Sequence, residues 1–255
     1  MCKFVKQTQL HFFMKTNQDF KNQALGALKG NWTQAALVSI IYMIIVGLYS
    51  GPLSYQIIET QSYIQANAGS PARVAAMLTD PEYLALSQRT HGVTGLSTLL
   101  FIMVILPLVV GLVNAFHRLL VRNDTELVAN TLHLAFSNYW HKVWGMLWMY
   151  ILTVLWSFLL IIPGIIKAFS YAMTPYILED CPELTATEAI HRSRMMMHGH
   201  KFDLFWLYLS FIGWWLLSIL TLGIGFIWLM PYMQTAAAGF YEEVKAEYEQ
   251  NGGLD

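Results

Sequence analysis

The sequence predicts an all-α fold: a polytopic helical membrane protein with six transmembrane helices and short interfacial amphipathic helices. The chain is 56% hydrophobic and only 12% charged, whereas soluble domains are usually about 45–50% apolar and about 25% charged. Residues 33–56 and 94–116 contain no Asp, Glu, Lys or Arg at all. Hydrocarbon tolerates such segments as helices, because a helix satisfies its own backbone hydrogen bonds.

The N-terminal part is expected to form a tail followed by a short helix. Residues 1–13 show no periodicity, and Met14 is an alternative to Met1 as the start of translation. Between residues 17 and 30 the apolar side chains recur on one helical stripe, formed by Phe20, Ala24, Leu25 and Leu28. This pattern is typical of an amphipathic helix lying in the membrane interface.

A single membrane domain is expected over residues 14–248, with residues 249–255 as a C-terminal tail. Its six spans are expected at about residues 34–56, 95–116, 143–162, 165–178, 204–220 and 226–241. Pro107 should kink or loosen the second span. The fourth span is short and contains Lys167, whose long side chain is expected to reach the outer headgroups.

Tight outer turns are predicted where Pro and Gly interrupt the apolar runs. Pro163-Gly164 should join the third and fourth spans, and Gly223-Ile224-Gly225 the fifth and sixth. Proline suits a turn because it fixes φ, and glycine because it tolerates positive φ.

The two hairpins closed by these turns resemble each other. A basic pair, His141-Lys142 or His200-Lys201, precedes a Pro-Tyr pair by 34 residues in the first hairpin and by 31 in the second. A duplicated unit and a chance match are both compatible with this similarity.

Three further motifs predict helix starts. Ser70-Pro71 and Asp80-Pro81 each place a capping residue before a proline that suits the first helical position. Thr185 and Glu188 form a capping-box pattern, which should begin a helix running to about His198.

The placement of basic residues predicts the orientation of the spans. With both termini in the cytoplasm, the inner segments hold 12 of the 15 Lys and Arg residues, and Arg73, Arg89 and Lys167 lie outside. This is the positive-inside pattern. Taking Pro163-Gly164 as a kink within one long helix would move Arg192, Arg194 and Lys201 outside, against the rule.

No catalytic or cofactor motif is apparent. Asp and Glu are absent from the middle of every expected span, which argues against a proton relay and against most intramembrane hydrolases. The cluster His191, His198 and His200 and the two cysteines lack the spacing of a metal site. Neither a metal nor another cofactor is expected. A net charge of −1 gives no general attraction to nucleic acid.

Basic residues on the inner segments form the candidate binding site. Its members are Arg118, Arg122, Arg192, Arg194 and Lys201. If they converge at the inner headgroup level, they could hold an anionic lipid phosphate, for which the forked guanidinium of Arg is suited. The alternative is that they spread around the perimeter and only orient the spans.

Several of these motifs resemble a known family. They are Gly30-Asn31-Trp32, Pro163-Gly164, Gly199-His200-Lys201, Phe211-Ile212-Gly213-Trp214, Gly223-Ile224-Gly225, Pro231-Tyr232 and Phe240-Tyr241. The pattern is similar to that of the bacterial integral membrane family catalogued as domain of unknown function nine-seven-five, over about residues 14–248. The resemblance implies a six-span protein of a bacterial inner membrane, with no reaction, substrate or active site to carry over.

Two function classes follow from these observations. The first is a non-enzymatic scaffold or accessory protein that interacts with membrane lipids, with a partner protein or with a second copy of itself. The second is a transporter or permease component with a path between the two C-terminal hairpins. An intramembrane enzyme is the least favoured class, because no catalytic motif supports it.

Overall fold

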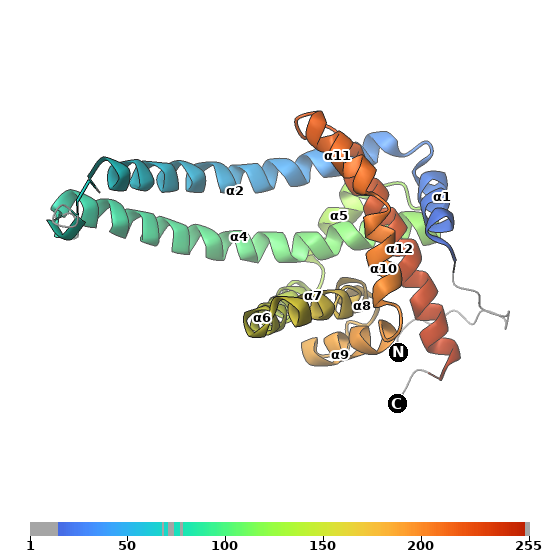
Figure 1. The fold of residues 1–255 in the computed structure, drawn as a ribbon. Coiled ribbons are helices and arrows are strands. Elements are labelled where there is room, and N and C mark those ends of the chain that lie inside the picture. The colour runs from blue at the N-terminus through green and yellow to red at the C-terminus, as the bar shows by residue number, and fades with distance from the viewer. Residues whose placement is uncertain (1–14, 68, 71–73, 77–78, 253–255) are drawn as a thin grey trace. The chain divides into compact units, whose positions relative to one another are not determined.

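The computed structural model describes residues 15–67, 69–70, 74–76 and 79–252 (Figure 1). This part of the chain consists of helices and turns without strands, which confirms the all-α prediction. The expected tail at residues 1–13 lies outside it. The helices are α1 (Asn17–Leu28), α2 (Trp32–Asn67), α4 (Pro81–Arg122), α5 (Leu127–Phe136), α6 (Tyr139–Leu159), α7 (Ile161–Ser170), α8 (Thr174–Asp180), α9 (Ala186–Met196), α10 (Lys201–Leu209), α11 (Ile212–Leu220) and α12 (Phe226–Gln250).

Four helical segments in the described part are long and apolar enough to cross a membrane. They are Trp32–Tyr49, Ser97–Arg122, Ile161–Asp180 and Lys201–Leu220. These segments coincide with the first, second, fourth and fifth expected spans. The third and sixth expected spans coincide with α6 and α12, which do not belong to this set. The chain therefore has apolar helices compatible with a membrane protein, of which four meet the requirements of length and hydropathy.

The helices divide into two compact units, and the smaller is Ile41–Ile105, from α2 and α4. Within it, the rings of Tyr49 and Phe101 stack with centroids 3.9 Å apart. The hydroxyl of Tyr49 also lies 2.9 Å from that of Thr98. Further along, the hydroxyl of Tyr63 donates a 2.7 Å hydrogen bond to Asp80, which raises the pKa of Tyr63 to about 12.

In the larger unit, α1 packs against α12 (Figure 1). Phe20, Ala24 and Leu28 are buried, and the ring of Phe20 lies 5.7 Å from that of Phe240. Three of the four stripe residues are thus buried inside the protein, whereas Leu25 is 42% exposed. Small residues of α12, Gly239 among them, let α1 approach closely enough to bury Phe20, Ala24 and Leu28.

The first hairpin reverses direction earlier than expected. Leu160 has an extended conformation (φ −163°, ψ 141°) and separates α6 from α7. Pro163 and Gly164, predicted as the turn, lie instead in the first turns of α7, where a proline leaves no intrahelical hydrogen bond unmade. Gly164 faces α6, and a Cβ there would lie 2.7 Å from the Cα of Ser157. The motif thus serves helix contact rather than chain reversal.

The second hairpin turns where the sequence places the turn. Leu222 and Gly223 have positive φ values of 53° and 90°, and Gly225 is the N-cap of α12. A Cβ on Gly225 would lie 2.7 Å from the Cα of Ser218. Both hairpins therefore pack a glycine against the serine seven residues before it. This shared contact favours duplication over a chance match.

Two predicted helix starts are observed in the described residues. Helix α4 begins at Pro81, with Asp80 Oδ1 accepting a 2.9 Å hydrogen bond from the backbone N–H of Glu82. Helix α9 begins after Thr185 with the predicted capping box, in which the Thr185 N–H donates to Glu188 at 2.7 Å. Pro71 lies outside the described residues.

Candidate anion-binding site

A buried ion pair takes one of the five candidate cations out of consideration. Helix α8 ends in Glu179 and Asp180. Glu179 lies 2.6 Å from Lys142 Nζ of α6 and 3.2 Å from Arg118 Nη2 of α4. The Lys142 side chain is fully buried, and its ammonium also donates to Ser137 Oγ (2.8 Å) and to the carbonyl oxygen of Leu134. Arg118, whose side chain is 26% exposed, thus shares the Glu179 carboxylate with Lys142.

A second set of polar contacts fastens α12 to α4 and α8. Tyr241 Oη donates to Asp180 at 2.7 Å, and Lys245 pairs with the same carboxylate. His117 of α4 lies 2.6 Å from Glu242. Burial by itself raises the pKa of Glu242, but the contact with His117 and the charge of Lys245 outweigh it and hold that pKa below its usual range. Sequence reasoning missed these contacts, because they join residues more than 60 positions apart.

Arg192 and Arg122 have different surroundings. The guanidinium of Arg192 lies 5.6 Å from the ring centre of Tyr248, and its Nη1 is 3.5 Å from Cys181 Sγ. These contacts engage Arg192 with α12 and with the end of α8. Arg122 is exposed at the C-terminus of α4 and forms no salt bridge within the described part of the chain.

Arg194 and Lys201 are the two candidate cations that the structure brings together, and Lys167 joins them. Both lie close enough to Lys167 to act on it as like charges. Arg194 is exposed, and the other two side chains are half-buried. None of the three forms a salt bridge with a described residue. This group is called the basic triad below.

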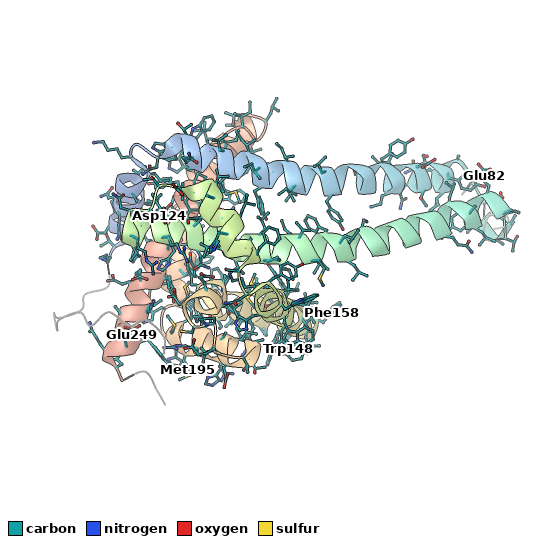
Figure 2. The ribbon with its side chains drawn as sticks, turned by 180° about the vertical axis from the view of Figure 1, so that it is seen from behind. Glu82, Asp124, Trp148, Phe158, Met195 and Glu249 are labelled. Carbon is teal, nitrogen blue, oxygen red and sulfur yellow. The ribbon has the colours of Figure 1, made fainter. Side chains whose placement is uncertain are left out.

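The position of Lys167 corrects the expectation from the sequence. Lys167 was expected at the outer headgroups, and Arg194 and Lys201 at the inner ones. Residues within electrostatic reach of one another cannot lie on opposite sides of a hydrocarbon core of about 30 Å. Lys167 is therefore not separated from Arg194 and Lys201 by the full thickness of such a core. Met195, labelled in Figure 2, marks the end of α9 at which Arg194 lies, and Phe158 marks the far end of the hairpin.

The histidines have ordinary surroundings. His200 contacts Asp203 and Glu247, both at 3.3 Å, while His191 and His198 are exposed. In the residues that the structure describes, no group of three or more His, Cys, Asp or Glu side chains could hold a metal ion.

Comparison with known proteins identifies one related group. The model of the family described as Protein of unknown function (DUF975) matches residues 14–248. No curated protein and no solved structure matches the chain.

Proposed function

Since the chain belongs to the DUF975 family, we propose that it is a non-enzymatic membrane protein that binds an anionic lipid headgroup through Arg194 and Lys201. The observation that carries this proposal is the gathering of Lys167, Arg194 and Lys201, none of which forms a salt bridge with a described carboxylate. Uncompensated like charges repel one another, so an anion between them lowers the free energy of the site. Each cation near an anionic membrane surface contributes about 1 kcal/mol.

The surroundings of the cations favour a lipid as the source of the anion. Phe202 and Trp206 of α10 are 74% and 55% exposed, close in sequence to Lys201. Large exposed apolar side chains of this kind are suited to contact with acyl chains.

The proposed setting is the cytoplasmic membrane of a bacterium, with six helical crossings and both termini in the cytoplasm. Helices α2, α4, α6, α7 with α8, α10 with α11, and α12 would supply the crossings. The excess of Lys and Arg on the inner segments supports this orientation.

Native mass spectrometry of the purified protein tests the proposed function. Arg194→Ala and Lys201→Ala should each reduce the fraction of protein that retains a co-purified anionic lipid. Arg192→Ala should reduce it less, because Tyr248 already engages that guanidinium. Lys29→Ala, which removes an exposed lysine at the end of α1, is the matched control. Equal retention in the control and in both triad variants would overturn the proposal.

A further inference from the structure

Helix α7 packs against both elements that carry the other two triad cations. Ser193 of α9 donates a 3.0 Å hydrogen bond to the carbonyl oxygen of Ser170, one turn after Lys167. The ring of Phe169 meets that of Phe205 of α10, with centroids 6.0 Å apart. Arg194 follows Ser193 directly, and Lys201 precedes Phe205 by one turn. These contacts of α7 with α9 and α10 place Lys167 near both cations.

Local contacts also position the Lys167 ammonium without neutralising it. Its Nζ lies 4.6 Å from the ring centre of Trp156. An aromatic face attracts a cation but accepts no conventional hydrogen bond, so the donors of the ammonium stay available to an anion. Asp203, the carboxylate nearest to Lys201 in sequence, is 3.3 Å from His200.

From this arrangement we infer that Lys167 completes the lipid site, and that the site takes a phosphomonoester headgroup rather than a phosphodiester. The inference rests on the proposed function. It adds Lys167 as a third cation of the site and names the class of headgroup that the site binds. A phosphomonoester carries a charge of about −1.5 to −2 at neutral pH and three acceptor oxygens. A phosphodiester carries a single charge, so it matches three cations less well. The shared chemistry is a terminal phosphate, on a lipid or free in solution.

Binding to vesicles tests the inference. The full-length protein in detergent is titrated with phosphatidylcholine vesicles containing either phosphatidic acid or phosphatidylglycerol. The parent protein should bind the phosphatidic acid vesicles more tightly. Lys167→Met keeps the aliphatic contact with Trp156 and should weaken that binding about five-fold, the effect of one cation. Lys167→Arg should restore it, and Lys29→Met should leave it unchanged. Thermal unfolding midpoints equal to that of the parent verify that the variants are folded.

The outcomes separate the two proposals. If Lys167→Met binds phosphatidic acid like the parent while Arg194→Ala and Lys201→Ala bind it more weakly, the role of Lys167 is refuted and the proposed function stands. If none of the three variants changes binding, the proposed function itself fails. Equal affinity of the parent for the two lipids would overturn the ligand class. Inorganic phosphate is tested in the same way. If it binds as tightly as phosphatidic acid and the same variants weaken its binding, the ligand is free phosphate and not a lipid.

Discussion

Replacing Glu179 by glutamine is expected to destabilise the folded protein by about 3–5 kcal/mol, the usual effect of removing one partner of a buried ion pair. Lys142 is fully buried, and its ammonium lies 2.6 Å from the Glu179 carboxylate. With an effective dielectric constant of about 20, two unit charges at this distance attract by about 6 kcal/mol. Desolvation of the ions offsets much of this attraction in the intact pair, but the variant keeps the cost of burying Lys142 and loses the attraction.

Lys142→Met is the matched variant on the other side of the pair. Glu179 would keep Arg118 at 3.2 Å, so its charge stays paired. The Leu134 carbonyl and the Ser137 hydroxyl would lose their donor, at a cost of about 1–3 kcal/mol. The double variant contains neither the buried ammonium nor the carboxylate. It should therefore be more stable than the sum of the single effects predicts, by at least about 1 kcal/mol.

Equilibrium unfolding in mixed micelles, with an increasing fraction of a denaturing detergent, measures all four proteins of this cycle. Single-variant losses that add to within about 0.5 kcal/mol would refute the argument, since they would show that the two groups do not interact. A loss below about 1 kcal/mol for Glu179→Gln would refute it as well, because a buried ammonium without its counter-charge cannot be that well tolerated.

Three other predictions follow from the hairpins and from α12. Gly164→Leu should destabilise the protein by about 1–3 kcal/mol in the same assay, because the added carbons collide with Ser157; unchanged stability would contradict the observed contact. In a chain without its native cysteines, Leu160→Cys should react with a membrane-impermeant thiol reagent added to intact cells, because the six-crossing proposal places Leu160 outside. Reaction only after permeabilisation, or no reaction, would refute the crossing of that hairpin. The pKa of Glu242 is lowered below its ordinary value of 4.5 in the folded protein. The contact of its carboxylate with His117 therefore stabilises the fold above pH 4.5, and this stabilisation is lost as the pH falls through the pKa of the folded state. Glu242→Gln should therefore lower the unfolding midpoint at neutral pH and have little effect at a pH below the folded pKa; an equal loss at both would rule out the carboxylate charge as the cause.

Local sequence signals predicted the helices well. Charge-free apolar runs are local properties, and each expected span overlaps an observed helix. The start of α9 was also predictable, because the capping box of Thr185 and Glu188 is complete within four residues. The reversal at Leu160 was not, since a leucine carries no turn signal, and Pro163 is as well suited to the first turn of a helix as to a turn.

The site was predicted only in part, because its members come from distant helices. Sequence reasoning selected Arg194 and Lys201 from the surplus of basic residues, but it also selected Arg118, whose partner Glu179 lies 61 residues away. Lys167 was assigned to the opposite side of the membrane, since its place along the fourth span says nothing about the helices beside it. Such pairings depend on packing between helices, which the composition of a single segment does not specify.

The contact between α1 and α12 has a consequence for how the protein is made. About 200 residues separate Leu28 from Phe240, and at roughly 5–20 residues per second their synthesis takes about 10–40 s. Throughout that interval the apolar stripe of α1 has been synthesised but its final neighbour has not. We expect the surface of the membrane to shelter the stripe until α12 is made, so that α1 first lies on the lipid and later leaves it for the protein. In a chain that ends before Phe226, an environment-sensitive fluorophore attached to Leu28→Cys should therefore report a lipid environment. Emission typical of water would argue against this order of events.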